Sequence, residues 1–275
     1  MESLVSTEWL VQHLGEPDLT IVDCSWFMPS MGRSGRDEYL HAHIPGARFL
    51  DIDEVADRSN PAPHMLPSAD DFGHAMEQLG IGRDDRIIVY DNSPTRTAAR
   101  GWFMLRHFGA RDVAILDGGF QKWIAEDRPT ESGEAAPREA RFDAEENPAE
   151  IVAKANVLGC GPLLDARGAA RFTGEEADPR PGVEPGHIPG GRNLPFGLLY
   201  NEDGTFKPVD ELGRLFAEAG IDPARPFTAT CGSGVTANSL IFAAHLLGYD
   251  GNRLYDGSWS EWGADPATPK GLGPA

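Results

Sequence analysis

The feature that most constrains the fold of this chain is an internal repeat. Four short blocks of the first half recur in the second half, in the same order and at an offset of about 140 residues. The pairs are residues 19–23 with 162–165, 43–48 with 187–192, 87–91 with the strand that ends at Cys231, and 116–123 with 255–262. One fold is therefore used twice along the 275 residues.

Within each half, short apolar strands alternate with amphipathic helices. The spacing predicts helices over residues 72–79, 100–108, 212–219 and 238–247. Each of these is followed by a glycine that we expect to end the helix, at positions 80, 109, 220 and 248. Such alternation predicts an α/β fold in which each half holds a mainly parallel sheet flanked by helices.

The repeat also predicts the domain organisation. We expect a first domain over residues 1–136, a linker over 137–149 and a second domain over 150–275. The linker is expected because residues 128–147 are rich in Pro, Glu, Ala and Gly and poor in apolar side chains, although Phe142 can still dock on a domain surface. The C-terminal stretch 264–275 is expected to be mobile.

Charge and composition exclude several classes of protein. The net charge of −19 argues against nucleic acid and anionic membranes as partners. No apolar run reaches about 18 residues, so no membrane span is predicted. Because the N-terminus is acidic and lacks the features of a secretory signal, we expect a cytoplasmic protein.

The cysteines are few and far apart. The three, Cys24, Cys160 and Cys231, form no CxxC pair, which excludes a disulfide framework and a zinc cluster. We expect Cys24 and Cys160 to be small core or surface residues rather than reactive thiols. No metal or organic cofactor is expected.

Cys231 stands apart because of the residues around it. Residues 227–240 predict a strand, a tight loop and a helix, with Cys231 at the start of the loop. Gly232 and Gly234 let the backbone take positive φ, so that successive amides point inward beside a helix N-terminus and form an anion site. A cysteine there would be a thiolate nucleophile. The alternative is an inert cysteine packed under a glycine turn.

The corresponding loop of the first half lacks this chemistry. Asp91 stands where the second half has Cys231, and Asn92, Ser93 and Pro94 follow. Aspartate cannot act as a sulfur nucleophile, and proline removes one backbone amide from the loop. The first half is therefore predicted to be catalytically silent.

Residues 165–192 concentrate positive charge in an acidic protein. They carry four arginines, Arg167, Arg171, Arg180 and Arg192. The planar guanidinium group binds carboxylates through two parallel hydrogen bonds. The alternative for each is a surface or interdomain ion pair with the acidic residues at positions 175, 176 and 178.

These motifs together resemble a known family. The loop CGSGVTA resembles the active-site loop of the rhodanese superfamily, in the form seen in 3-mercaptopyruvate sulfurtransferases. Rhodaneses that prefer thiosulfate usually carry two basic residues where this chain has Gly232 and Ser233. The segment 165–190 resembles the family motif D-[AS]-R-x-x-x-R-F-x-G…P-R…G-H-I-P-G, and the resemblance extends over residues 3–265.

The resemblance implies two tandem rhodanese-like domains and assigns roles to individual residues. Arg171 and Arg180 match the pair that holds the α-keto acid, and Arg167 matches a structural arginine that braces the loop. The catalytic residues implied are Cys231, Ser233, Asp53 and His64, and the amides of Gly232, Gly234, Val235 and Thr236 would cradle the substrate and the persulfide. Ser233, His64 and Asp53 would form a Ser-His-Asp-like relay.

Other roles stay open for the residues of the first half. Asp53 could equally cap a helix, and His64 could be a turn residue. His43 and His187 recur in both halves, including the silent one, so we expect them to support loop structure.

The implied reaction is sulfur transfer. Cys231 would take sulfur from 3-mercaptopyruvate, release pyruvate, and pass the sulfur to cyanide or to a thiol acceptor such as thioredoxin or a small thiol. The alternatives are a thiosulfate sulfurtransferase and a non-enzymatic sulfur carrier. A cysteine phosphatase is disfavoured because Ala237 stands where such an enzyme needs an arginine.

Overall fold

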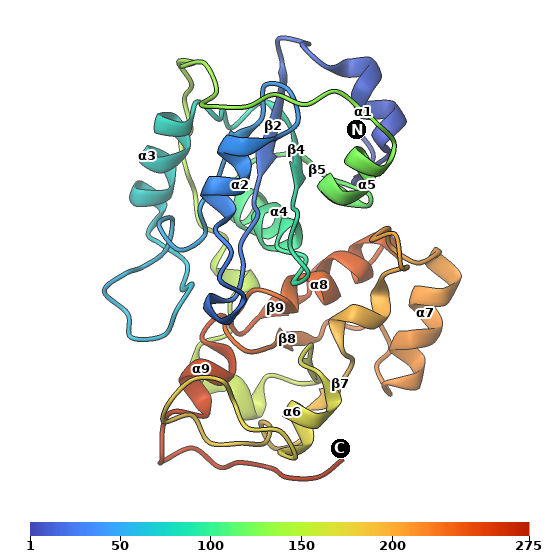
Figure 1. Cartoon of the computed structure of the whole chain (residues 1–275). Helices are drawn as coiled ribbons and strands as arrows, with labels where there is room; N and C mark the ends of the chain where they lie inside the picture. Colours follow the sequence, from blue (N-terminus) through green and yellow to red (C-terminus); the bar gives the residue numbers. More distant parts are fainter. Residues whose placement is uncertain (275) are drawn as a thin grey trace. The chain divides into compact units, whose positions relative to one another are not determined.

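A computed structural model describes residues 1–274 and divides into two compact units (Figure 1). The first unit comprises Met1–Asp57, Leu66–Asn147 and Glu202–Phe206. The second comprises Arg58–Met65, Pro148–Asn201 and the chain from Lys207 onward. Each unit holds a parallel sheet with helices around it, so the predicted α/β fold class is confirmed.

The sheet of the first unit has five strands. Their order is β1 (Leu4–Val5), β5 (Asp112–Leu116), β4 (Arg86–Tyr90), β2 (Leu19–Asp23) and β3 (Arg48–Phe49), and every neighbouring pair is parallel. The residues of β4 from Ile87 to Tyr90 are all buried. Both faces of a parallel sheet are covered, which is why this strand reads as a continuous apolar run.

The helices of the first unit begin and end where the sequence provides caps. They are α1 (Thr7–His13), α2 (Gly35–His41), α3 (Ala69–Leu79), α4 (Ala98–His107) and α5 (Gly119–Ala125), with a short 3₁₀ turn, η1 (Pro29–Met31). The hydroxyls of Ser6, Ser34 and Ser68 accept backbone amides in the first turns of α1, α2 and α3. Gly80 and Gly109 follow α3 and α4 at φ 70° and 101°, as predicted for glycines that end helices.

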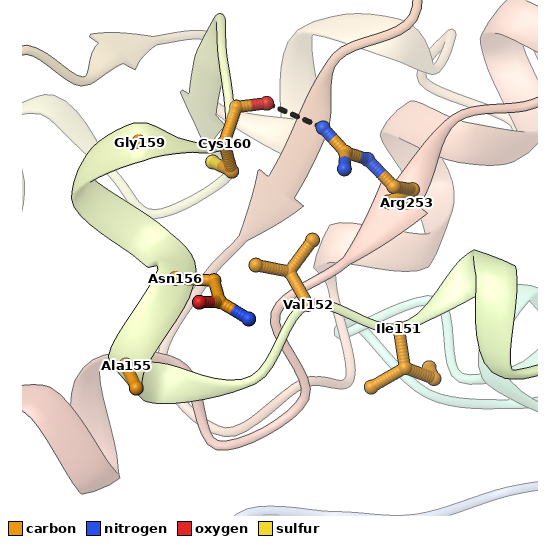
Figure 2. A pocket seen from close by; sticks show the side chains of 7 residues that line it. All are labelled: Ile151, Val152, Ala155, Asn156, Gly159, Cys160 and Arg253. Carbon is orange, nitrogen blue, oxygen red and sulfur yellow. Dashed lines mark hydrogen bonds between the residues drawn. The ribbon is translucent and has the colours of Figure 1, made fainter.

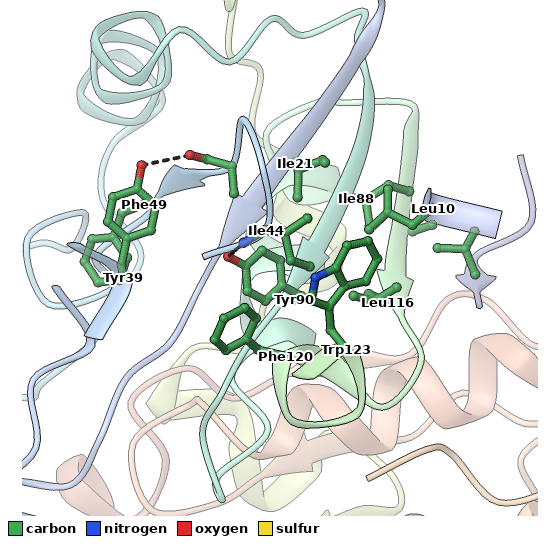
Figure 3. Close-up of a cluster of buried hydrophobic side chains, with 13 residues drawn as sticks. Leu10, Ile21, Tyr39, Ile44, Phe49, Ile88, Tyr90, Leu116, Phe120 and Trp123 are labelled. Atoms are coloured by element: carbon green, nitrogen blue, oxygen red, sulfur yellow. Dashed lines mark hydrogen bonds between the residues drawn. The ribbon is translucent and has the colours of Figure 1, made fainter. Parts of the chain in front are cut away.

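The two faces of this sheet are covered by different helices. On one face, Leu10 of α1 and Trp123 of α5 cluster with Ile88 of β4 (Figure 3). Tyr39 of α2 belongs to the same cluster and lies beside Phe49 of β3, at a ring-centroid distance of 5.4 Å. On the other face α4 approaches closely at Gly101, where a Cβ would lie only 2.3 Å from the sulfur of Cys24.

Cys24 is a core residue, as predicted. Its side chain is fully buried. Burial raises the pKa of the Cys24 thiol well above its ordinary value, and the nearby carboxylates of Asp23 and Asp91 raise it further. A thiol held protonated in this way is unreactive.

Residues 137–147, at the start of the predicted linker, pack along the first unit. Phe142 is buried with its ring edge against Phe72, at a centroid distance of 5.5 Å. Arg138 forms an ion pair with Asp85 at 2.8 Å. These contacts explain why the segment is ordered despite its few apolar residues. The domain limits at 136 and 150 stay a prediction.

The second unit repeats the sheet of the first. Its order is β7 (Arg192–Asn193), β6 (Leu163–Asp165), β8 (Thr228–Thr230) and β9 (Arg253–Leu254), again with parallel pairs throughout. This matches the order β3, β2, β4, β5. An isolated parallel bridge between Ile151 and Leu254 stands where β1 pairs with β5. The internal repeat therefore corresponds to one topology used twice.

The helices of the second unit follow the same plan. They are α6 (Ala169–Thr173), α7 (Val209–Glu218), α8 (Ala237–Leu246) and α9 (Ser258–Trp262), with the 3₁₀ turns η2 (Pro148–Glu150), η3 (Lys154–Gly159) and η4 (Phe196–Leu199). Gly220 and Gly248 follow α7 and α8 at φ 73° and 85°, as predicted. Within residues 1–274, no helix has the length and apolar character needed to cross a membrane.

The C-terminal stretch does not behave as predicted. Gly271 exchanges two backbone hydrogen bonds with His187, at 2.9 and 2.8 Å, and the indole of Trp262 donates to the carbonyl of Pro269. The expectation of mobility is therefore wrong for residues 264–273, because this segment pairs with the HIPG turn. His43 of the first unit pairs with Glu131 in the same way. Ala275 lies outside the described residues.

Candidate active site

Cys231 lies at the carboxyl end of β8, between β6 and β9 in the sheet of the second unit. The loop that it begins leads directly into α8. In open parallel sheets, ligands bind outside the carboxyl ends of the strands. The side chain is only 1% exposed, so the thiol is held at a defined position in the fold.

Most amides of this loop are unbonded. The N–H groups of Gly232, Ser233, Val235 and Thr236 donate to no acceptor within residues 1–274. The amide of Gly234 differs, because it lies 3.1 Å from the hydroxyl of Ser258. Four unsatisfied donors in a short loop at a helix N-terminus favour negative charge beside Cys231.

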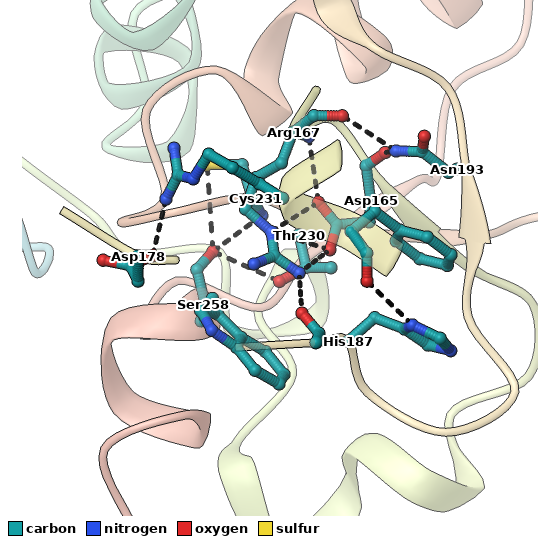
Figure 4. A network of polar contacts seen from close by, with 12 residues as sticks. Asp165, Arg167, Asp178, His187, Asn193, Thr230, Cys231 and Ser258 are labelled. Carbon is teal, nitrogen blue, oxygen red and sulfur yellow. Dashed lines mark hydrogen bonds and ion pairs between the residues drawn. The ribbon is translucent and has the colours of Figure 1, made fainter. Parts of the chain in front are cut away.

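The side chain of Ser258 holds the Cys231 loop in place through hydrogen bonds, and the sequence analysis did not identify this residue. Its hydroxyl oxygen accepts hydrogen bonds from the amides of Cys231 at 3.0 Å and Gly234 at 3.1 Å, and its O–H group donates to the carbonyl of Tyr255 at 2.9 Å (Figure 4). It also lies 4.0 Å from the sulfur of Cys231. Ser258 therefore ties both ends of the tight turn to α9.

The backbone of Ser258 is unusual and shows how it could have been found. Its φ is 50°, in the left-handed region that favours glycine. Gly119 occupies the same place in the first unit, at φ 59°. A comparison of the two repeats shows a residue with a side chain where the silent half has glycine. That difference is the sequence signal for Ser258.

The two glycines of the loop serve different purposes. Gly234 has φ 72°, and a Cβ there would lie 2.5 Å from the carbonyl oxygen of Asp256, so the positive φ predicted for this glycine is confirmed. Gly232 is not at positive φ, so that part of the prediction is wrong. A Cβ on Gly232 would instead lie 2.8 Å from Nη2 of Arg180 and 3.4 Å from Nη2 of Arg171. Glycine is needed there for space, because two guanidinium groups lie against it.

Arg171 and Arg180 converge on one buried carboxylate. Arg171 lies in α6 and Arg180 in the loop that follows, and they contact Asp178 at 2.6 and 3.2 Å. The predicted alternative of an ion pair with an acidic neighbour is therefore real for both. The pKa of Arg180 is lowered mainly by burial and further by Arg171, while Asp178 and Cys231 oppose the change. The side chain of Arg171 is 20% exposed and that of Arg180 is 29% exposed, so a ligand can reach both.

Arg167 has the structural role that was expected. Its guanidinium forms hydrogen bonds to both carboxylate oxygens of Asp165 and to the carbonyl of Gly186, and it stacks over the ring of Trp259 at 4.6 Å (Figure 4). The side chain is almost fully buried. Arg167 thus links the end of β6 to α9.

Ser233 and His64 lie together in the second unit. Nδ1 of His64 is 2.9 Å from the hydroxyl oxygen of Ser233, and both side chains are buried. His64 has φ 61°, so it is also a turn residue. Asp53 belongs to the first unit, where its carboxylate accepts a hydrogen bond from the indole of Trp26 at 2.8 Å.

The repeated histidines support loops, as expected. Nδ1 of His43 lies 2.7 Å from the carbonyl of Tyr39, and Nδ1 of His187 lies 2.9 Å from the carbonyl of Phe172. Each imidazole stacks on the ring of the residue whose carbonyl it contacts. Both are buried in the HIPG turns of their units.

In the first unit, the loop that corresponds to the Cys231 loop has its amides bound by the carboxylate of Asp91. One oxygen of Asp91 accepts the amide of Ser93 at 2.8 Å, and the other accepts the amide of Ala98 at 2.7 Å. Ala98 is the first residue of α4. The negative charge that this loop and helix favour is therefore already supplied from within the chain.

A separate cavity of about 460 Å³ opens on the second unit (Figure 2). It is lined by Ile151, Val152, Ala155, Asn156, Gly159, Cys160 and Arg253, and the guanidinium of Arg253 donates to the carbonyl of Cys160. None of the residues of the Cys231 loop belongs to it. Within residues 1–274, no group of three or more His, Cys, Asp or Glu side chains is arranged to hold a metal ion.

Comparison with known proteins identifies the family of both halves of the chain. The Rhodanese-like domain family matches residues 6–126 and again residues 148–265. The chain belongs to this family. The 3-mercaptopyruvate sulfurtransferase of Escherichia coli K12 is 41% identical over 271 residues, which cover 96% of each chain. The human protein of that name is also 41% identical, over 94% of this chain and 91% of its own length.

A solved structure of a relative supports the same family assignment. A crystal structure of the Escherichia coli protein SseA, described as a 3-mercaptopyruvate sulfotransferase, matches 95% of this chain and all of that chain, with a TM-score of 0.86 and 39% identity. The thiosulfate sulfurtransferase of Gallus gallus is 38% identical over 94% of this chain and 93% of its own length. Overall identity therefore separates the two donor classes little.

Proposed function

We propose that this rhodanese is a 3-mercaptopyruvate sulfurtransferase that works through a persulfide on Cys231. The observation that carries the proposal is the placement of two guanidinium groups against Gly232, next to a loop with neutral residues at positions 232 and 233. Two forked cations suit the carboxylate and ketone of an α-keto acid. Relatives with this name at about 40% identity over most of the chain support the same assignment.

In the first half-reaction, the thiolate of Cys231 attacks the sulfur of 3-mercaptopyruvate. A sulfur–sulfur bond forms and the carbon–sulfur bond breaks, leaving its electron pair on carbon as the enolate of pyruvate. Arg171 and Arg180 hold the carboxylate and the developing enolate oxygen, which lowers the barrier electrostatically. The enolate then takes up a proton and leaves as pyruvate.

In the second half-reaction, an acceptor removes the outer sulfur. The persulfide rests beside the unbonded amides of Gly232, Ser233, Val235 and Thr236, which favour its negative charge. A thiolate acceptor, such as a small thiol or thioredoxin, or cyanide attacks the outer sulfur and regenerates Cys231. Both half-reactions proceed without a resident metal or organic cofactor, and we place the enzyme in the cytoplasm.

Ser233 and His64 supply the proton path. The hydroxyl of Ser233 lies 2.9 Å from Nδ1 of His64, and we expect it to meet the thiol of the donor, so that a proton can pass between donor and imidazole. We include Asp53 in this proposal because the resemblance to the family implies a catalytic role for it. Gly234 contributes by shaping the turn through its left-handed backbone.

The alternatives make different demands on these residues. Thiosulfate is a compact dianion and is better matched to basic side chains within the loop itself, which Gly232 and Ser233 do not provide. A sulfur carrier without enzymatic activity would need no carboxylate-binding pair such as Arg171 and Arg180.

The donor assignment is tested by steady-state kinetics with 3-mercaptopyruvate and thiosulfate, with pyruvate release measured directly. We expect a higher kcat/KM for 3-mercaptopyruvate. Arg171→Lys and Arg180→Lys keep the charge but remove the fork, and should each lower this value by about 10- to 1,000-fold. A wild type that is faster with thiosulfate would overturn the proposal.

The nucleophile is tested by mass spectrometry of the protein after reaction with donor alone. One added sulfur should appear on the peptide that contains Cys231, and Cys231→Ser should remain folded but inactive. Sulfur found on Cys24 or Cys160 instead would assign the chemistry to another thiol.

A further inference from the structure

We propose that Asp178 is a donor-selecting residue, because its buried carboxylate sets the net charge of the arginine pair that receives the sulfur donor. The inference builds on the proposed function of Arg171 and Arg180. It adds that a carboxylate of the protein, and not only the neutral loop, makes the site prefer a singly charged donor over a doubly charged one.

The contacts of Asp178 are with both arginines at once. One carboxylate oxygen accepts from Nη2 of Arg171 at 2.6 Å, and the other accepts from Nη1 of Arg180 at 3.2 Å and from the backbone amide of Arg180 at 3.0 Å. The Asp178 side chain is 1% exposed. Because water is excluded from this carboxylate, its field at the two guanidinium groups is only weakly screened.

The three side chains form a unit with a net charge of one. Two guanidinium groups carry two positive charges, and Asp178 cancels one of them. At neutral pH 3-mercaptopyruvate brings one carboxylate charge, whereas thiosulfate brings two negative charges. A site of single positive charge is neutralised by the first donor but leaves the second with uncompensated negative charge in a partly buried site.

The geometry leaves Arg180 able to bind a donor while Asp178 holds it, and leaves Nε of Arg171 unpaired among the described residues. Asp178 contacts Nη1 of Arg180, and Nη2 of Arg180 is the atom that lies against Gly232. Nε of Arg171 is buried and has no hydrogen-bond partner within residues 1–274. Asp178 therefore holds Arg180 without consuming Nη2 beside Gly232, whereas for Arg171 the Nη2 that Asp178 binds is also the atom that lies near Gly232.

The test compares the two donors in charge-changing variants. Asp178→Asn keeps the shape of the side chain and removes its charge, so the ratio of kcat/KM for thiosulfate to that for 3-mercaptopyruvate should rise by about tenfold or more. Asp178→Glu keeps the charge and should leave the ratio within about threefold of wild type. Asp178→Ser also removes the charge, and replaces Asp178→Asn in the comparison if that variant is unfolded by circular dichroism.

A matched control separates a local effect from the global charge. Glu176→Gln removes one negative charge from an exposed residue two positions away, and should leave the donor ratio unchanged. Equal losses for both donors in Asp178→Asn would make Asp178 a simple brace and overturn the inference. An equal shift of the ratio in Glu176→Gln would also overturn it. Failure of the proposed function shows separately, as a wild type without pyruvate release from 3-mercaptopyruvate.

Discussion

Asp23 and Asp165 end equivalent strands of the two units, yet their surroundings differ. The carboxylate of Asp165 is paired with the guanidinium of Arg167. In the first unit the residue two positions after the aspartate is Ser25, whose amide donates to Asp23 at 2.8 Å. Burial without a paired cation raises the pKa of Asp23 to about 7, against the hydrogen bonds of Ser25 and Tyr90.

This difference predicts a pH dependence of stability. Because the pKa of Asp23 is higher in the folded state than in the unfolded chain, protonation favours folding. That contribution is fully present below about pH 4 and is lost as the pH rises through 7. Between pH 5 and pH 8 it should remove about 2 kcal/mol from the free energy of unfolding.

Asp23→Asn should abolish this part of the pH dependence, because the amide stays neutral and still accepts the amide of Ser25. Urea denaturation at a series of pH values measures the difference in unfolding free energy between variant and wild type. The difference should move in favour of the variant as the pH rises. Parallel pH profiles for the two proteins would show that Asp23 is not the group responsible.

The turn between β8 and α8 depends on α9 through Ser258, and substitutions can separate the two properties of this residue. Ser258→Gly removes the hydroxyl but suits the left-handed backbone, as Gly119 does in the first unit. Ser258→Ala removes the hydroxyl and keeps the strain, so it should be less stable than Ser258→Gly by about 1 kcal/mol.

Both variants should lose kcat for sulfur transfer to a similar degree, by about tenfold, since both leave the amides of Cys231 and Gly234 without their acceptor. Ser260→Ala, which removes a hydroxyl bonded within the same helix, is the control. Wild-type kcat in Ser258→Gly would mean that the hydroxyl does not support the loop.

A substitution of Asp91, in the loop before α4, should change the free energy of unfolding with little change in sulfur-transfer activity. Asp91→Ala leaves the amides of Ser93 and Ala98 without the carboxylate, which should lower the free energy of unfolding by about 1 kcal/mol. Sulfur transfer should fall less than tenfold, because Asp91 supports no nucleophile. A larger loss of kcat in a folded variant would contradict the silent-half prediction.

Two short segments each belong to the unit that is formed mainly by the other half of the sequence, and one of these segments carries His64. Residues 58–65 form part of the second unit and residues 202–206 part of the first. The proton path proposed for the Cys231 loop therefore includes a residue from the first half of the sequence.

His64→Asn tests that path, since asparagine tolerates the left-handed backbone that His64 adopts. We expect kcat/KM for 3-mercaptopyruvate to fall by about 100-fold. If Ser233 and His64 act in one step, Ser233→Ala added to His64→Asn should cost little more. His74→Asn, on α3, is the control. Fully additive losses would place the two residues in separate steps.

The sequence predicted the features that depend on local patterns. Strands, helices, helix-ending glycines and Cys231 each follow from periodicity or from a motif. The sequence did not reveal Ser258 or the space required at Gly232, because both depend on packing between segments far apart in the chain. The ordered C-terminal stretch was missed for the same reason: its stability comes from pairing with the HIPG turn and not from its own composition.

The carboxylate of Asp91 has a consequence for how such a duplicated protein can change over time. A cysteine at this position would lose the hydrogen bonds that Asp91 accepts from Ser93 in the loop and from Ala98 at the start of α4, while Pro94 would still deprive the loop of one amide. In a chain that uses one fold twice, a change from Asp91 to cysteine would therefore lower folding stability before the loop could support a second reactive sulfur.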